Sequence, residues 1–161
     1  MCNRFRTLQR ATAAFSLCAL ALVARGQQVP TEVRDALKRA DDAVAKIVAL
    51  PDGQRTFDNT LGALDDLATH LESETNLPTF MQYVSTSEKE RDDARAAEEA
   101  ISEWSIALGK REDLYRAVKA YADTKPSLQG EQKRLLEFTL RDYRRAGMDL
   151  PVDKRDRLKA I

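Results

Sequence analysis

Apolar residues recur along most of this chain at the three- and four-residue spacing of amphipathic helices, and no stretch alternates strictly as a half-buried strand does. The first predicted helix begins at Thr31, which can cap it just after Pro30. It ends at Pro51, Asp52 and Gly53, which are turn-forming residues. Its expected buried stripe consists of Val33, Leu37, Ala40, Val44, Ile47 and Val48. We expect this stripe to dock against other helices.

A second helix is predicted from about Thr56. Pro78 is expected to end it near Asn76, because helical geometry is disfavoured for the residue before a proline. Its apolar face comprises Phe57, Leu61, Leu64, Ala68 and Leu71. The apolar residues beyond the proline, namely Phe80, Met81, Tyr83 and Val84, are expected to form a short turn.

The strongest helix signal lies between Ser87 and Tyr121. Ser87 and Glu90 have the spacing of a capping box, in which each side chain satisfies the other residue's backbone amide. Apolar residues then follow with alternating spacings of three and four, at Ala94, Ala97, Ile101, Trp104 and Leu108, and again at Tyr115, Val118 and Ala122. Arg111 interrupts this seam and Gly109 weakens it. The pattern predicts one long helix over about 87–121, roughly 50 Å in length.

Two further helices are predicted towards the end of the chain. Residues 123–130, which include Pro126, are expected to form a loop. An amphipathic helix follows, with Leu136, Leu140 and Tyr143 on one face, and Gly147 ends it in the left-handed conformation. Pro151 fits the first turn of another helix, which has no capping signal before Ile161. The expected fold class is therefore all-α.

The first 26 residues have the pattern of a secretory signal peptide. Arg4, Arg6 and Arg10 precede an uncharged run from Ala11 to Ala24, and small residues up to Gly26 offer a cleavage site. This run is shorter than the roughly 20 residues that a membrane-spanning helix needs, so no stable membrane anchor is expected. We therefore predict a signal peptide over 1–26, a helical region over 27–161, and a periplasmic or secreted protein after cleavage.

Cleavage would change the cysteine content and the charge. Cys2 and Cys18 would both leave with the signal, so the mature chain would have neither a disulfide nor a thiolate metal ligand. The whole chain has 26 basic and 26 acidic residues, and the loss of four arginines with the signal gives a formal charge of −4. A mildly acidic surface argues against nucleic acid as a partner.

The candidate chemistry is sparse. The single histidine, His70, has Asp66 and Glu74 four residues to either side, which on a helix makes half a metal site, but a solvated helix face is the favoured interpretation. The pairs Asp41–Asp42, Asp65–Asp66 and Glu98–Glu99 diverge on a helix and are interpreted as surface. Pairing with Glu137 and Glu131 explains most of the basic run Arg141, Arg144 and Arg145, and Trp104 and Tyr115 are expected to pack in the core. No catalytic, cofactor-binding or metal residue is predicted.

Three phrases resemble the amino-terminal region of the thimet oligopeptidase and oligopeptidase A family of zinc metallopeptidases. They are FDNTLGAL at 57–64, the stretch from Ser87 to Tyr121, and LLEFTLRDYRRAGMDLP at 135–151. The last is the most specific. The resemblance covers about Val33 to Ile161.

This resemblance implies a larger, nearly all-helical peptidase fold whose two halves enclose a channel. In such enzymes a His-Glu-x-x-His helix and a later glutamate hold zinc, which activates water for attack on a peptide carbonyl. This chain lacks that motif, so it is expected to be inactive alone and to contain no cofactor, with zinc implied only for the full-length family member. Its expected role is a segment of the channel wall of a truncated peptidase. Its expected partners are the missing catalytic domain and short peptides.

Two other interpretations remain open. The chain could be a stand-alone exported helical bundle that binds a partner without catalysis. An enzyme using carboxylates alone is the third interpretation, although no spacing here makes two carboxylates converge.

Overall fold

The computed structural model describes residues 28–159, which form six α-helices and no strand. The predicted signal peptide lies outside these residues. The elements are α1 (Thr31–Ala49), the short 3₁₀ turn η1 (Asp52–Gln54), the π-helical turn η2 (Asp58–Gly62), α2 (Ala63–Val84), α3 (Glu88–Gly109), α4 (Glu112–Asp123), α5 (Gly130–Arg145) and α6 (Val152–Lys159). The all-α prediction is confirmed. None of these helices is long and apolar enough to cross a membrane.

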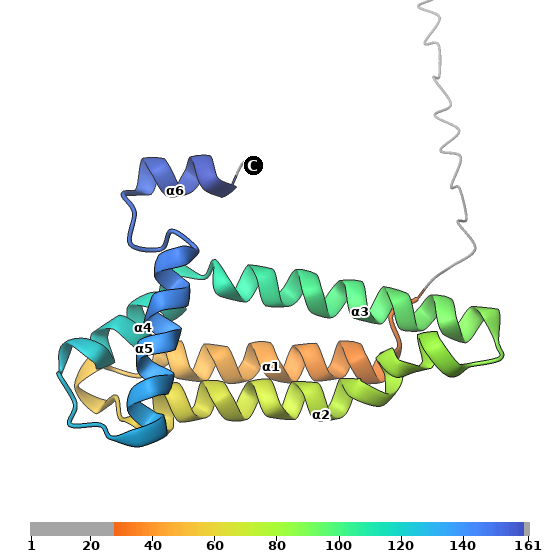
Figure 1. Ribbon diagram of the computed structural model, residues 1–161, viewed down its shortest axis with the longest axis horizontal. Helices are drawn as coiled ribbons and strands as arrows, with labels where there is room; N and C mark the ends of the chain where they lie inside the picture. Colours follow the sequence, from red (N-terminus) through yellow and green to blue (C-terminus); the bar gives the residue numbers. More distant parts are fainter. Residues whose placement is uncertain (1–27, 160–161) are drawn as a thin grey trace, which may run out of the picture.

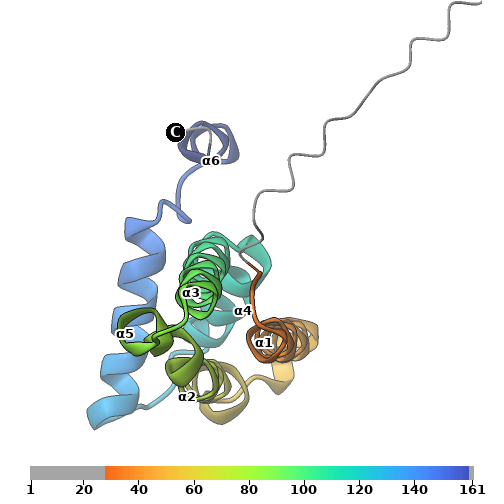
Figure 2. The ribbon, with the colours of Figure 1, turned by 90° about the vertical axis from the view of Figure 1, so that its right-hand side faces the viewer.

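Three long helices form the body of the molecule. Figure 1 shows α1, α2 and α3 side by side, with α2 antiparallel to the other two. Seen end-on in Figure 2, they occupy the corners of a triangle. The shorter helices α4 and α5 lie at one end of this bundle, and α6 projects beyond them (Figure 1). This end closes the core, whereas much of the α2–α3 hairpin extends away from it.

The core lies where α1 meets α2 and α4. Val33, in the first turn of α1, is fully buried outside the main cluster. Within that cluster, Val44 of α1 and Leu114 and Val118 of α4 are fully buried, and Leu61 in the π-helical turn is nearly so. Their neighbours in the same cluster are Ala36, Ala40, Ile47, Leu67, Leu71, Tyr121, Tyr143 and Met148. The stripe predicted on the first helix is therefore the buried one, except that Leu37 and Val48 are only partly covered.

The prediction that the second helix ends near Asn76 is wrong, because α2 continues through Pro78 to Val84. Threonine hydroxyls donate to helix carbonyls around the proline: Thr75 to Leu71 O at 2.7 Å and Thr79 to Thr75 O at 2.9 Å. The last turns of α2 also bend towards α3 in Figure 1, as expected where a proline removes a backbone donor. Packing against α3 therefore outweighs the local preference.

The single helix predicted over 87–121 is divided, because α3 ends at Gly109 and α4 begins at Glu112. Arg111, which would fall on the apolar seam, adopts an extended conformation, and its guanidinium pairs with Asp113 at 2.6 Å. The Asp113 carboxylate also accepts from the amide of Leu114 in the first turn of α4. The break rotates the buried face of α4 to Leu114, Ala117, Val118 and Tyr121 instead of the predicted Tyr115, Val118 and Ala122.

The predicted helix ends have mixed outcomes. Pro30 takes the N-cap position of α1 and no side chain caps this helix, so the role predicted for Thr31 is wrong. Ser87 does cap α3, accepting from the Glu90 amide at 3.3 Å. The Glu90 carboxylate does not reach back to the cap amide. It accepts from the Ser85 hydroxyl, and Ser85 Oγ accepts from Ser87 N.

The predicted end of α5 is confirmed. Gly147 has a φ of +78°, and the amides of Gly147 and Met148 donate to Arg144 O and Tyr143 O at 2.9 and 3.0 Å. This is the double bond of a Schellman motif, which satisfies the carbonyls at the end of a helix. The following helix, α6, begins directly after Pro151 as expected.

Candidate functional site

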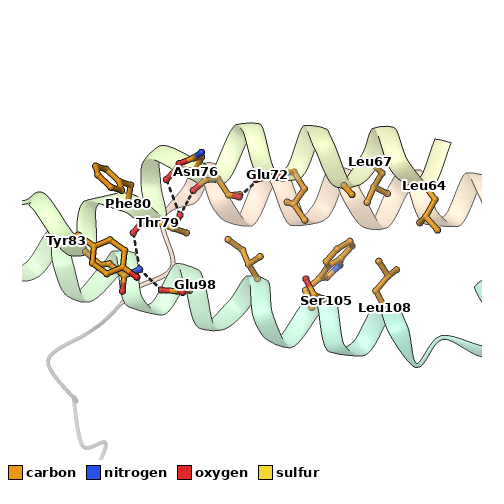
Figure 3. A pocket seen from close by; sticks show the side chains of 16 residues that line it. Leu64, Leu67, Glu72, Asn76, Thr79, Phe80, Tyr83, Glu98, Ser105 and Leu108 are labelled. Carbon is orange, nitrogen blue, oxygen red and sulfur yellow. Dashed lines mark hydrogen bonds between the residues drawn. The ribbon is translucent and has the colours of Figure 1, made fainter. Parts of the chain in front are cut away.

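An apolar groove of about 620 Å³ lies between α2 and α3 (Figure 3). We call it the α2–α3 groove. It is lined by Leu64, Leu67, Ala68, Leu71, Glu72, Thr75, Asn76, Thr79, Phe80, Gln82 and Tyr83 of α2 and by Glu98, Ile101, Trp104, Ser105 and Leu108 of α3. The two sets recur at three- and four-residue spacing, so each helix contributes one ridge to the groove.

A hydrogen bond to α1 holds Trp104 in place between α2 and α3. Trp104 is partly buried, and its indole Nε1 donates to Asp41 Oδ1 of α1 at 2.8 Å. This bond fixes the indole and joins residues 63 positions apart in sequence. The prediction that Trp104 packs against the core is confirmed, and Trp104 also lines the groove.

Replacing Asp41 by alanine is expected to lower the free energy of unfolding by about 1 kcal/mol, the usual contribution of one side-chain hydrogen bond. Asp41→Asn keeps an acceptor oxygen and should lose less than half of that. Asp42→Ala, on the neighbouring exposed position, is the control. Urea denaturation followed by the emission of Trp104, the single tryptophan, measures all three. Equal losses for Asp41→Ala and Asp42→Ala would contradict the assignment.

One end of the groove is aromatic and open to solvent. Phe80 and Tyr83 lie with their ring centroids 6.2 Å apart, and they remain 50% and 70% exposed. Leu77 and Val84 nearby on α2 are also exposed. Exposed apolar side chains gathered on one helix end are typical of a surface that another molecule or segment covers.

The polar groups of the groove are carboxylates and amides. Glu98 accepts from the side-chain amide of Gln82, which links α3 to α2, and Figure 3 shows Glu72 further along α2. The described lining residues include neither histidine, cysteine, lysine nor arginine. The groove therefore offers apolar contacts bordered by two carboxylates and by side-chain amides.

Comparison with known proteins points in one direction. The chain is 35% identical over 140 residues to the thimet-like oligopeptidase of Dictyostelium discoideum, a match that covers 84% of this chain and 21% of that protein. It is 29% identical over 123 residues to a probable thimet oligopeptidase of Arabidopsis thaliana, covering 76% of this chain and 17% of that one. No protein-family model matches.

The chain is homologous to the thimet-like oligopeptidases. The homology extends over most of its length, and the chain spans about a fifth of the length of the curated relatives that it matches. The resemblance inferred from the three sequence phrases is thereby confirmed. Its all-helical consequence agrees with the structure.

The structure does not bring His70, Asp66 and Glu74 together as one cluster of side chains. His70 is exposed, and its Nδ1 lies 2.6 Å from the backbone oxygen of Asp66, within hydrogen-bonding distance. Glu74 pairs with Arg39 of α1 instead of facing His70. Among residues 28–159 no group of three or more histidine, cysteine or acidic side chains is placed to hold a metal ion.

The acidic pairs of the oligopeptidase homologue have separate roles. Asp41 binds Trp104 while Asp42 is exposed, and Glu98 binds Gln82 while Glu99 is exposed. Asp65 and Asp66 are both exposed. No adjacent pair converges on one point.

The basic run on α5 is paired, but not as expected. Arg141 and Arg145 lie 3.0 and 3.8 Å from Asp142, and Arg144 lies 3.9 Å from Asp149. Glu137, expected to pair with Arg141, lies instead 3.9 Å from Lys133. The Arg141 guanidinium stacks over the ring of Phe138 at 4.3 Å, and Arg134 lies 4.9 Å from the same ring.

The sequence pattern does not predict the structural role of Arg55. Its side chain is only 4% exposed, and its guanidinium donates to the backbone oxygens of Ile47 and Leu50 at 2.9 and 2.7 Å. It also pairs with Asp52 at 2.9 Å. The C-terminal carbonyls of α1 are thereby satisfied by one side chain from the following loop. A single arginine between two turns gives no periodic signal.

The buried phenol of Tyr143 is expected to reduce the stability of the fold at alkaline pH. Burial raises the pKa of Tyr143 to about 12 from an ordinary value of 10.0, with a smaller contribution from Asp113, and Arg111 opposes the rise. A raised pKa means that the folded state keeps its proton where the unfolded chain has lost it. The stability from the neutral phenol is complete below pH 10 and is lost as pH rises from 10 towards 12.

Tyr143→Phe is expected to reduce that loss by about 1.4 kcal/mol per pH unit above pH 10. Urea denaturation of both proteins from pH 9 to pH 12 measures the free energy of unfolding across this range. Burial also raises the pKa of Tyr121, so Tyr143→Phe should keep part of the alkaline sensitivity. Identical pH profiles for the two proteins would show that the phenol ionises without cost.

Proposed function

We propose that this chain is a non-catalytic helical segment of a zinc-dependent oligopeptidase and forms part of the wall of its peptide channel. The observation that carries the proposal is the 35% identity to the Dictyostelium thimet-like oligopeptidase over 84% of this chain. Because the chain spans about a fifth of that protein, the rest of an oligopeptidase would come from residues outside the match. Short peptides would be the substrates of the assembled enzyme.

The few side chains that could bind zinc support a non-catalytic role for the chain. Zinc peptidases of the kind implied hold the metal with two histidines and a carboxylate, and this chain has one histidine. The described residues near His70 do not fit the metal, because Glu74 is engaged by Arg39 and the imidazole faces a backbone oxygen. Zinc binding and proton transfer are therefore assigned to residues outside this chain.

The chain contributes an apolar surface for contacts with other parts of the enzyme. The α2–α3 groove is apolar and open, and its aromatic end is solvent-exposed. Such a face allows the segment to dock against the rest of the enzyme, and the docked helices then narrow access to the catalytic centre. Folded proteins would then be excluded while short, unfolded peptides enter. Export is part of the proposal, because three arginines precede the apolar run of residues 11–24.

The test is complementation in trans. The Dictyostelium relative is made without the segment that matches this chain and is mixed with the full 161-residue chain. Cleavage of a short quenched-fluorescence peptide is expected only when both are present, and a chelator should abolish it. If both proteins are folded and no cleavage appears at any ratio, the proposal is wrong.

A stand-alone binding protein is the second candidate, and the closed core favours it. Val33, Val44, Leu114 and Val118 are all fully buried within this chain alone, so the bundle needs no further segment to cover them. This candidate predicts a cooperative, monomeric protein that does not restore cleavage. The complementation assay therefore separates the two.

A further inference from the structure

We propose that the α2–α3 groove is the docking site for one amphipathic helix with lysine or arginine on both flanks, supplied by the part of the oligopeptidase that this chain does not contain. The source of the docked helix rests on the proposed function. The chemistry by which the groove would recognise a helix is independent of that function.

The shape of the groove suits a helix. Its lining runs along α2 from Leu64 to Tyr83, about 28 Å at 1.5 Å per residue. Leu67, Leu71 and Thr75 form the ridge on α2, and Ile101, Trp104 and Leu108 form the ridge on α3. Two such ridges leave a furrow into which the ridge of a further helix packs. A docked helix of about five turns would then complete a four-helix arrangement with α1, α2 and α3.

Backbone chemistry disfavours an extended peptide in the same place. An extended chain needs partners for its amides and carbonyls, which a sheet edge provides and two helices do not. The side-chain amide of Gln82, at the rim, already donates to Glu98 and to the carbonyl of Thr79. A helix brings its own backbone bonds and needs only an apolar face.

Charge selects the flanks of the occupant. Helix α2 carries Asp65, Asp66, Glu72 and Glu74 and contains neither lysine nor arginine. Glu74 is neutralised by Arg39, but within the described residues Glu72 and Glu98 form no ion pair although both line the groove. They lie on opposite helices, and Glu98 contacts Gln82, ten residues beyond Glu72. Basic residues about 15 Å apart on opposite flanks of a docked helix would meet them.

The same charges argue against a second copy of the chain as the occupant. A symmetric dimer through this groove would bring the acidic α2 of one copy against the acidic α2 of the other. Like charges brought together at an interface oppose association. The acidic side chains of α2 that would repel a second copy would attract a basic partner helix.

The experiment uses the full chain and synthetic peptides, with Trp104 emission as the signal, because this single tryptophan lines the groove. The probe is an end-blocked helical peptide of about five turns with leucines on one face and lysines on both flanks. One control peptide has glutamates in place of the lysines, and another carries two prolines that prevent helix formation. The lysine peptide should bind saturably and at least about tenfold more tightly than either control.

Two pairs of variants locate the contact. Phe80→Ser should weaken binding of the lysine peptide at least about tenfold, since it removes an aromatic group from the groove. Ile106→Ser, which changes an exposed residue of α3 that does not line the groove, should leave binding unchanged. Glu72→Lys should weaken it about threefold and strengthen binding of the glutamate peptide. The exposed Glu99→Lys should do neither. Circular dichroism confirms that each variant is folded.

Several results would overturn the inference. Equal binding of the lysine and proline peptides would indicate an extended ligand, and a dimer that Phe80→Ser dissolves would make a second copy the occupant. Equal effects of Phe80→Ser and Ile106→Ser would place the contact elsewhere. In the complementation assay, full rescue by Phe80→Ser would refute the groove and leave the channel-wall proposal intact. Peptide binding as predicted without rescue would support the groove and refute the channel wall.

Discussion

Arg55→Met is expected to lower the free energy of unfolding by about 3 kcal/mol, since it removes the guanidinium donor from the part-buried carbonyls of Ile47 and Leu50 at the end of α1. The methionine is similar in length and apolar, so the loss reports hydrogen bonds more than volume. For a domain of this size that corresponds to a fall in Tm of roughly 10 °C. Urea and thermal denaturation, followed by helical circular dichroism, measure it.

The matched control for Arg55 is Asp52→Asn. The Asp52 carboxylate is 74% exposed, so its ion pair with Arg55 contributes little, and the change should cost less than about 0.5 kcal/mol. Arg55→Lys should recover only part of the loss, because one ammonium cannot replace a guanidinium that reaches several carbonyls. A loss for Asp52→Asn as large as that for Arg55→Met would mean that the surface ion pair, and not the helix end, carries the effect.

Leu114→Ala is expected to cost about 3 kcal/mol or more, as deletion of a fully buried leucine leaves a cavity that its neighbours fill only in part. Leu114 lies in the first turn of α4, directly after the break at Arg111. Its burial depends on that break, because an unbroken seam would direct Tyr115 inward instead. The variant therefore tests the register of α4 as well as its packing.

The control for Leu114 is Ile106→Ala on the exposed face of α3, which should change stability by less than about 0.5 kcal/mol. Both are measured by urea denaturation under the same conditions. A loss below about 1 kcal/mol for Leu114→Ala would show that this leucine is not a core residue.

The sequence predicts the helices well because each must bury one apolar face. The stripe of α1, the Ser87 cap and the glycine end of α5 all follow from local spacing. The helix bounds predicted at Pro78 and Arg111 are wrong for one shared reason, because tertiary contacts determine the backbone conformation at both residues. Packing on α3 continues α2 through the proline, and the cost of burying Arg111 on the seam divides the expected long helix.

The candidate site could be predicted only in part. Helical spacing identifies Ile101, Trp104 and Leu108 as an apolar ridge, but it cannot say that the facing ridge belongs to α2 or that their groove stays open. The bond from Trp104 to Asp41 joins distant parts of the chain, and so does the pair between Arg39 and Glu74. Such contacts depend on how helices pack and leave no trace in local periodicity.

The proposed supporting role rests on the homology of the chain and on its open apolar surface. The chain matches oligopeptidases over most of its length, yet the part that the structure describes brings no set of metal donors together. Its open apolar surface is gathered on α2 and α3, while the other end of the bundle is closed by α4 and α5. A segment that docks and shapes a channel needs these properties and no more.

The most direct test of this account is the zinc content and peptidase activity of the chain alone, made from Gln27 onward so that Cys2 and Cys18 do not contribute ligands. After dialysis against zinc and removal of excess, the account predicts far less than one zinc per chain and no cleavage of a short peptide above background. One tightly held zinc per chain together with cleavage that a chelator abolishes would contradict it.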